Sequence, residues 1–471
     1  MIDTDLKFLE TEFKEELLFF PDSETLKVRH RFTEKDNKFV NTVTVNGKTY
    51  AYGNLVKPAS DETEKKRLVK RYAKLSLYKA VSQFTGIKLP WGALTGVRPT
   101  KLAYSAIEET GEFREFFTDV MKVSEKKTEL IAEVIENQKG IYSKNPDNSD
   151  LFVFVPFCPS RCRYCSFITA DMKSSASLTD DYVNALCEEI KESARFIKKL
   201  RSIYVGGGTP VALSDKQLEK MLCAIDKIRD GVEYTVEAGR PDRITEENLK
   251  ILKAHGVTRV CVNPQSLSDE TLKRIGRNHT AAETIRALEL AKKDFIVNTD
   301  LIAGLEGETF ATFKETIDKT IELSPDNITV HSLCVKKGAE LASEVKIFNS
   351  DTEKMIDYAE GALKTAGYGA YYVYRQKYAA GNLENAGFTK SGKACVYNVD
   401  AMEEISDCVA CGANAISKKV DFAGEKIERY GSPKDVKTYL SKKGEILRKK
   451  AAFFSEKLKM SRVNAKKVKK N

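Results

Sequence analysis

The chain has 471 residues, of which 42% are hydrophobic and 31% are charged, a composition that excludes an intrinsically disordered protein. No apolar run reaches the length of a membrane span, and the acidic N-terminus is unlike a signal peptide, so we expect a cytoplasmic protein. The net charge of +9 is local, because residues 441–471 carry twelve Lys and Arg against two Glu (+10), which leaves 65 basic and 66 acidic residues (−1) in residues 1–440. We interpret residues 441–471 as a solvated basic tail, and weak binding to nucleic acid or another anionic surface is the alternative.

Residues 1–145 are predicted to form an N-terminal α+β region. Alternating apolar and polar residues predict a small antiparallel sheet, and Asn46-Gly47 suits a type I′ hairpin turn within it. The predicted elements are strands at 26–32 and 38–53, a helix at 60–84 and a second helical region that ends near 140. The polar, turn-rich stretch 144–150 marks the boundary with the next domain.

From residue 151 onward, strand and helix patterns alternate six times. The predicted strands are residues 151–157, 202–208, 233–238, 259–264, 295–304 and 327–333. Such alternation requires parallel strands joined by helical crossovers, so the fold class is α/β. It favours a TIM-type, partial (β/α)6 barrel over residues 151–340, with an open doubly wound sheet as the alternative. A C-terminal α/β extension is expected at residues 345–440.

Polar or Gly-rich residues recur at the C-terminal ends of the predicted strands. They are the Cys loop after the first strand, the GGGTP stretch (206–210), Glu237, Gln265, Asp300 and His331. In parallel α/β folds this edge of the sheet binds ligands. The sequence therefore predicts one composite ligand site there.

Cys158, Cys162 and Cys165 form a C-x3-C-x2-C motif. Three thiolates can ligate three irons of a [4Fe–4S] cluster, which leaves the fourth iron for a small molecule with an amine and a carboxylate. Zinc is the competing metal, but a tetrahedral site needs a fourth nearby ligand, and no His lies near in the sequence. Three unligated packing thiols are disfavoured, because such a cluster in a loop with two Arg seldom serves packing.

The Cys loop, with Tyr164 before its last Cys, resembles the radical S-adenosylmethionine (SAM) superfamily. With the later motifs it resembles the oxygen-independent coproporphyrinogen III oxidase (dehydrogenase) family over about residues 151–416. Those motifs are GGGTP (206–210), VEAGRPD (236–242), NPQSL (263–267), LKRIGRNHT (272–280) and NTDLIAGL (298–305). The stretch GALTGVRPTKL (92–102) further resembles the longer, coproporphyrinogen dehydrogenase-like branch of Gram-positive bacteria.

This resemblance implies two cofactors, a [4Fe–4S] cluster on Cys158, Cys162 and Cys165, and SAM. The implied SAM contacts are Tyr164 beside the cluster; Gly207, Gly208 and Thr209 at the methionyl amino end; Glu237, Gln265 and Asp300 at the ribose; Arg277 at the carboxylate; and Ile302 and Cys334 at the adenine. These residue types fit, since glycine lets a backbone approach a ligand, carboxylates accept bonds from hydroxyls, and arginine pairs with carboxylates. A phosphate loop is the alternative for the glycines, but no Gly-Lys-Ser/Thr follows them.

Four features depart from the family pattern or stay outside it. Phe152 stands where the family commonly has Tyr, and Phe167 where some members have a further Cys. Cys408 and Cys411 form a C-x-x-C pair near Cys395 that could help to bind a second metal, an interpretation we disfavour because no second pair lies at the usual spacing. The remaining helical cysteines, Cys187 and Cys223, are interpreted as core thiols.

The resemblance implies a radical SAM oxidoreductase of porphyrin and haem biosynthesis that converts two propionates of coproporphyrinogen III to vinyl groups, giving protoporphyrinogen IX. A 5′-deoxyadenosyl radical from the cofactor performs the chemistry, so no catalytic side chain is assigned. The alternatives are a haem-binding chaperone of the same branch and a radical SAM enzyme acting on RNA. Expected partners are a tetrapyrrole and an electron donor such as a flavodoxin or ferredoxin; we expect a monomer without nucleic acid. Candidates for the substrate carboxylates are Arg161, Arg163, Arg240 and Arg375.

Overall fold

The computed structural model divides the chain into two compact units. It describes residues 2–59, 61–94, 98–166, 170–334, 339–340, 350–376, 379, 382–422 and 426–468. The first unit comprises Met1–Glu133, Lys346–Glu353 and Tyr374–Glu384, and the second comprises Val134–Val345, Lys354–Val373 and Asn385–Asn471. Of the positions singled out in the sequence, Phe167, residues 95–97, the expected boundary at 345 and the tail end at 469–471 lie outside the described residues.

The first unit contains a four-stranded sheet in the order β1–β2–β3–β4. Its strands are β1 (Ile2–Thr4), β2 (Val28–Lys35), β3 (Lys38–Val45) and β4 (Lys48–Leu55). The last three pair antiparallel, whereas β1, which no sequence pattern indicated, is parallel to β2. Asn46 and Gly47 have φ of 46° and 89° and join β3 to β4, which confirms the predicted hairpin turn.

The helices of the N-terminal region are α1 (Glu10–Leu17), α2 (Glu62–Thr85), α3 (Pro99–Thr110) and α4 (Glu125–Asn137). The predicted helix at 60–84 is confirmed as α2. It begins at Asp61, whose carboxylate accepts a bond from the Glu64 amide at 2.7 Å, and it ends at Gly86 in the left-handed conformation. Such an N-cap stabilises a helix by about 1 kcal/mol.

A buried group of charged and aromatic side chains lies within the first unit. Trp91 Nε1 donates to Glu384 Oε2 at 2.5 Å, and Lys127 Nζ pairs with Glu384 Oε1 at 2.5 Å. The guanidinium of Arg375 lies 5.2 Å from the centre of the Trp91 ring and donates to the Leu94 carbonyl. Arg375, considered above for the substrate carboxylates, is 3% exposed, and its guanidinium bonds to groups inside this unit instead.

The second unit is built on an eleven-stranded sheet in the order β13–β14–β12–β11–β10–β9–β8–β5–β15–β16–β17. The six predicted strands are β5 (Asn148–Val155), β8 (Lys199–Gly207), β9 (Glu233–Gly239), β10 (Arg259–Val262), β11 (Ile296–Ala303) and β12 (Asn327–Ser332). They lie side by side in chain order, and each is parallel to its neighbour. The predicted partial (β/α)6 barrel is confirmed, since the sheet runs on past β5 and β12 to end strands instead of closing.

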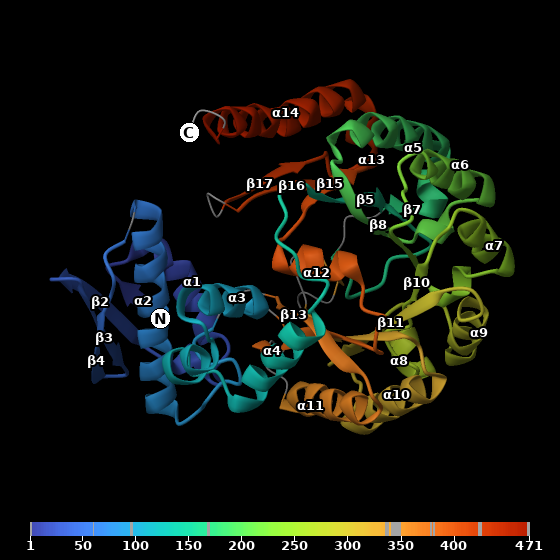
Figure 1. Ribbon diagram of the computed structural model, residues 1–471. Helices are drawn as coiled ribbons and strands as arrows, with labels where there is room; N and C mark the ends of the chain where they lie inside the picture. The colour runs from blue at the N-terminus through green and yellow to red at the C-terminus, as the bar shows by residue number, and fades with distance from the viewer. Residues whose placement is uncertain are drawn as a thin grey trace. The chain divides into compact units, whose positions relative to one another are not determined.

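Helices cover the convex side of this sheet (Figure 1). They are α5 (Met172–Ser193), α6 (Asp215–Asp226), α7 (Glu246–Ala254), α9 (Ala281–Ala291), α10 (Phe310–Leu323) and α11 (Ser350–Thr365), whereas the short helix α8 (Asp269–Arg274) packs with Tyr164 and Ile302. Leu151, Val153 and Val155 of β5 pack in the apolar core with these helices, whereas Phe152 and Phe154 point to the concave side. None of the helices in the described chain is long and apolar enough to cross a membrane.

The region expected as a C-terminal extension adds strands to both edges of the same sheet. It contributes β13 (Gly369–Arg375) and β14 (Glu384–Thr389) at one edge and β15 (Asp407–Cys411), β16 (Ile416–Asp421) and β17 (Lys426–Gly431) at the other. Between them α12 (Val396–Glu403) lies on the concave side of the sheet (Figure 1). Glu233 of β9 holds its first turn, accepting from the amides of Val396 and Tyr397 at 3.0 and 3.2 Å.

The predicted solvated tail begins instead as packed helix, with α13 (Val436–Ser441) and α14 (Lys443–Val468). Lys450 is fully buried, and its Nζ donates to Glu189 Oε1 of α5 at 2.5 Å and to the Ala410 carbonyl of β15 at 2.7 Å. Phe454 stacks on Phe196 with ring centres 5.0 Å apart. The expectation of a solvated chain therefore does not hold for residues 443–454, because an ion pair and aromatic packing fix them to the barrel.

Candidate active site

The three motif cysteines lie in the loop that follows β5. Cys158 ends the short strand β6 (Phe157–Cys158), which pairs with β7 (Ala170–Asp171). The Cys165 amide donates to the Cys162 carbonyl at 3.0 Å, which closes a tight turn between them. Cys162 is 8% exposed, Cys158 and Cys165 are half-buried, and none of the three forms a disulfide. The loop therefore carries the three motif cysteines at the C-terminal edge of the barrel, although within the described residues no group of three or more Cys, His, Asp or Glu side chains is yet arranged to hold a metal ion.

Arg163, inside this loop, ties it to the neighbouring loops. Its backbone amide donates to the Ile275 carbonyl at 3.1 Å, and its guanidinium donates to Glu306 Oε2 at 2.9 Å. Ile275 follows α8, and Glu306 follows β11, so the Cys loop is fixed across the edge of the sheet. Of the other arginines considered for substrate, Arg240 is 4% exposed and donates to Asp242 at 2.9 Å. Both side chains are thus occupied by protein carboxylates.

The glycine stretch after β8 packs directly against the Cys loop. The Gly208 amide donates to the Val155 carbonyl at 2.6 Å, and Thr209 Oγ1 lies 3.7 Å from Cys158 Sγ. A Cβ at Gly208 would lie 2.4 Å from the Phe157 carbonyl oxygen and 3.0 Å from Cys158 Sγ. Gly207 has φ of 111°, a conformation that side chains disfavour. Glycine is therefore required at both positions, because the main chain and side chains around the Cys loop pack closely against them.

Tyr164 and Arg277 meet at the same edge. Arg277 Nη2 donates to the Tyr164 hydroxyl at 2.9 Å and Nη1 donates to the Asn263 carbonyl at 2.7 Å. Tyr164 packs on a small apolar cluster that contains Ile302, and burial raises the pKa of its hydroxyl. Arg277 is 9% exposed, and its buried Nε finds no partner among the described residues. The structure thus brings together Tyr164, Arg277 and Ile302, three of the predicted SAM contacts.

Two carboxylates lie on the concave side at the ends of β9 and β11. Burial raises the pKa of Glu237 to about 7, although the Tyr204 hydroxyl donates to its Oε1 at 2.5 Å. Burial alone would also raise the pKa of Asp300, but His331, with Nε2 3.7 Å from Oδ2, and Asn298, donating at 2.8 Å, hold that pKa below its usual value. Asp300 is therefore ionised at neutral pH, while Glu237 is poised between its two forms.

Gln265 joins these groups through a strained backbone. Its φ is 75°, its amide donates to the Asp300 carbonyl at 3.0 Å, and its carbonyl accepts from the Ile302 amide at 2.9 Å. The side-chain Oε1 is buried without a partner in the part of the chain that the structure describes. A left-handed non-glycine residue costs about 1–3 kcal/mol and is typical of ligand sites. Cys334 is half-buried just after β12, next to Leu333, whose amide bonds to the Ala303 carbonyl at 2.9 Å.

Cys408 and Cys411, the C-x-x-C pair considered for a second metal, do not converge on one site. In β15, Cys408 is directed to the concave side, whereas Cys411 packs in the outer core beside Lys450. Residues three apart in a strand point to opposite faces, so this C-x-x-C pair does not converge. Cys187 packs against the outer core as predicted, but the prediction of a core thiol is wrong for Cys223, which is exposed on α6.

Sequence reasoning missed Tyr204 and the supporting role of His331. Tyr204 comes two residues before Gly206, so strand alternation places both on the concave face, and a Cβ at Gly206 would lie 3.0 Å from Glu237 Cδ. The stretch SIYVGGG contains both residues, but only the register of β8 against β9 shows that they face Glu237. The sequence analysis placed His331 at the end of a strand, but it did not predict that this side chain lies beside Asp300.

The fold and the site define a class of protein. The family model described as the radical SAM superfamily matches residues 152–320. The oxygen-independent coproporphyrinogen-III oxidase-like protein HemZ of Bacillus subtilis is 32% identical over 423 residues, which cover 84% of this chain and 84% of that protein. The chain therefore belongs to the oxygen-independent coproporphyrinogen-III oxidase-like family of the radical SAM superfamily.

Two further similarities stand beside this one. The heme chaperone HemW of Haemophilus influenzae is 30% identical over 63% of this chain and 76% of its own length. The solved structure of coproporphyrinogen III oxidase (HemN) from Escherichia coli matches with a TM-score of 0.52 at 20% identity, covering 68% of this chain and 72% of that one. At that identity the HemN match supports the fold alone. As a radical SAM protein, the chain uses a [4Fe–4S] cluster and SAM.

Proposed function

We propose that Cys158, Cys162 and Cys165 hold the cluster and leave one iron open to SAM. The three motif cysteines lie in one loop and form no disulfide, which fits this role, and membership of the superfamily favours a cluster over a zinc ion. The cofactor pair supplies one-electron cleavage of SAM and hydrogen abstraction from the substrate. The protein has to hold both partners and keep water and oxygen away from them.

SAM binds, in this proposal, along the edge of the barrel next to the cysteines. Buried polar atoms that lack partners among the described residues support this, namely Gln265 Oε1 for a ribose hydroxyl and Arg277 Nε near the carboxylate. The remaining proposed contacts are Tyr164 beside the cluster, Gly207, Gly208 and Thr209 at the amino group, Glu237 and Asp300 at the ribose, and Ile302 and Cys334 at the adenine. The glycine stretch lies beside the motif cysteines, since a Cβ at Gly208 would lie 3.0 Å from Cys158 Sγ.

If Glu237 receives a ribose hydroxyl, SAM affinity depends on pH. The carboxylate is mostly protonated below its pKa of about 7, and the protonated form is the weaker acceptor. SAM should therefore bind more tightly as the pH rises from 6 to 8, by up to about tenfold, since about one tenth is ionised one unit below the pKa. Calorimetric titration of the anaerobic protein measures this. Glu237→Gln should flatten the dependence, and an equally steep curve in that variant would exclude Glu237 as its source.

For the reaction, we propose oxidative decarboxylation of coproporphyrinogen III propionates to vinyl groups, which gives protoporphyrinogen IX. The observation that carries this proposal is the 32% identity to the HemZ protein across 84% of both chains, including the region before the barrel. The concave side suits an apolar, planar substrate, because Tyr204 and Tyr397 stack there with ring centres 4.4 Å apart and Phe152 lies about parallel to Tyr397 at 6.0 Å. These rings exclude water beside Glu237.

A haem chaperone without decarboxylase activity is the second candidate. The 30% identity to a heme chaperone HemW favours it, as does Phe152, which supplies a ring but no hydroxyl at the position where the family commonly has Tyr. The electron donor, a flavodoxin or ferredoxin, and the monomeric state stay predictions. An RNA substrate receives less support than the sequence suggested, because Lys450 of the basic tail is buried.

Anaerobic reconstitution with iron and sulfide distinguishes these functions. The protein is then given SAM, a reductant and coproporphyrinogen III, and 5′-deoxyadenosine and protoporphyrinogen are measured by chromatography. Formation of both products is the expected result. SAM cleavage without a vinyl product, combined with stoichiometric haem binding in an equilibrium titration, would replace the oxidase by the chaperone.

A further inference from the structure

The buried carboxyl group of Glu308 is not among the proposed cofactor contacts. Glu308 lies in the turn between β11 and α10 and is 8% exposed. Its Oε1 accepts a hydrogen bond from Ser266 Oγ at 2.6 Å, whereas its Oε2 is buried without a partner among the described residues. Burying a carboxyl group costs stability, so a carboxyl group at this position calls for an explanation.

The turn that carries Glu308 has a defined backbone. The Glu308 amide donates to the Leu305 carbonyl at 3.1 Å, which closes the turn. Arg274 of α8 donates from Nη1 to the Glu306 carbonyl at 3.0 Å and so ties the turn to the neighbouring helix. The side chain of Glu308 is therefore presented to Ser266 from a fixed position.

Ser266 directly follows Gln265, the residue with the strained backbone. Gln265 has φ of 75°, and on one side its amide and carbonyl bond to the backbone of β11 at Asp300 and Ile302. On the other side Ser266 is fully buried and bonded to Glu308. A left-handed conformation of a non-glycine residue persists only where the surrounding structure holds it. The bond between Ser266 and Glu308 is one of the contacts that do so.

The hydroxyl of Ser266 depends on Glu308 as its acceptor. Ser266 Oγ accepts a bond from the Ser268 amide at 3.2 Å and has a single proton to donate. Thr316 Oγ1 of α10 lies 3.5 Å from Ser266 Oγ, a distance at which a hydrogen bond is weak, and it already accepts from the Leu267 amide at 3.2 Å. Removing the Glu308 oxygen therefore leaves the Ser266 proton without a good acceptor.

We propose that Glu308 is a positioning residue for SAM, which through Ser266 holds Gln265 in the left-handed conformation that the proposed ribose contact uses. The inference rests on the proposed function, in which Gln265 Oε1, buried without a partner in the described structure, meets a ribose hydroxyl. It adds a residue that touches no cofactor and yet determines how tightly SAM binds.

The test is calorimetric titration of SAM into the anaerobic, reconstituted protein, with cluster absorbance reporting its loading. Glu308→Leu removes the acceptor at similar size and should weaken SAM binding roughly tenfold, the effect of about one hydrogen bond. Burial raises the pKa of Glu308 to about 7, and Ser266 needs only an acceptor oxygen, so Glu308→Gln should bind SAM like the wild type. The matched control is Glu315→Leu, which changes an exposed carboxylate on α10 and should also bind like the wild type.

A double-mutant cycle tests whether Glu308 acts through Gln265. Gln265→Ala removes the proposed contact, so adding Glu308→Leu in that background should weaken SAM binding by less than about twofold. A full tenfold loss in both backgrounds would overturn the positioning role. Ser266→Ala removes the donor instead of the acceptor and should weaken binding by a similar factor. It replaces Glu308→Leu in the cycle if that variant does not fold.

Hydrogen exchange followed by mass spectrometry gives a measurement without SAM. Peptides that contain residues 263–268 should exchange faster in Glu308→Leu than in the wild type or Glu308→Gln, because the bond of the Gln265 amide to Asp300 opens more often. Unchanged exchange there, or wild-type SAM affinity in Glu308→Leu, would overturn the positioning role and leave the proposed function standing. A wild-type protein that binds no SAM would overturn the proposed function itself.

Discussion

Replacing Cys162 by Ala abolishes the visible absorbance of the reconstituted cluster and the cleavage of SAM. Cys162 is the most buried of the three motif cysteines, and the Cys165 amide bonds to its carbonyl, so the substitution removes a proposed ligand and keeps the turn. Two thiolates in the loop cannot hold the cube with a single open iron. We expect cluster content and 5′-deoxyadenosine formation to fall to background.

The control for this variant is Cys223→Ala. Cys223 is exposed on α6 and belongs to neither proposed cofactor site, so iron content and SAM cleavage should equal those of the wild type. Full cluster absorbance in Cys162→Ala, or its loss in Cys223→Ala, would show that the ligands are assigned wrongly.

Replacing Lys450 by Met lowers the free energy of unfolding by about 3–5 kcal/mol, because it leaves a buried carboxylate without its cation. Lys450 Nζ donates to Glu189 and to the Ala410 carbonyl, and Glu189 also accepts from Tyr439 and from the Gly412 amide. These bonds join α14 to α5 and to β15 at the edge of the barrel. Urea denaturation followed by far-UV circular dichroism measures the loss.

Two further variants test whether the loss of stability comes from the Lys450–Glu189 ion pair or from any substitution in α14. Lys449→Met, on the exposed face of the same turn, removes only the surface pair with Glu445 and should change stability by less than about 0.5 kcal/mol. Glu189→Gln combined with Lys450→Met removes both charges and should recover part of the loss. If Lys450→Met were as stable as Lys449→Met, the buried pair would not hold the C-terminal helix.

The strand–helix alternation was predictable because each unit carries local signals. Ser214 and Gln217 form a capping box with both of its hydrogen bonds, and Thr245 with Asn248 forms another. Parallel strands then bring their C-terminal ends to one edge. The cysteine loop, the glycine stretch, Glu237 and Gln265 therefore gather as expected from chain order alone.

Other features depend on contacts between residues far apart in the chain, so the local sequence could not predict them. Lys450 belongs to a basic stretch of sequence, and its partners Glu189 and Ala410, which lie earlier in the chain, explain why its side chain is buried. Arg375 has the residue type of a substrate ligand, but packing on Trp91 determines its role. The sequence of α12 has no strong apolar periodicity, so the helix could not be predicted from a local pattern. Contacts with Glu233 and with the aromatic rings of the barrel hold it in place.

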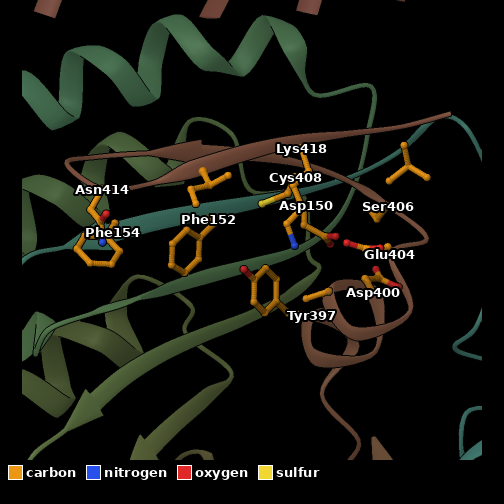
Figure 2. Close-up of a pocket in the computed structure, with 13 residues that line it drawn as sticks. Asp150, Phe152, Phe154, Tyr397, Asp400, Glu404, Ser406, Cys408, Asn414 and Lys418 are labelled. Atoms are coloured by element: carbon orange, nitrogen blue, oxygen red, sulfur yellow. The ribbon is translucent and has the colours of Figure 1, made fainter. Parts of the chain in front are cut away.

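Phe152 shows what the structure adds to a departure from the family pattern. As a sequence difference it suggests a lost hydroxyl contact, which stays a prediction. In the fold its ring stacks on Tyr397, with ring centres 6.0 Å apart (Figure 2), so the position contributes to the aromatic packing on the concave side.

The central claim is that three cysteines hold a [4Fe–4S] cluster whose fourth iron is left for SAM. Electron–nuclear double resonance of the reduced, anaerobic protein with SAM labelled at the amino nitrogen tests it most directly. We predict coupling of the label to the cluster, and its loss in Cys162→Ala together with the cluster itself. A cluster that shows no coupling to labelled SAM, or reconstituted protein without a cubane signal, would contradict the account.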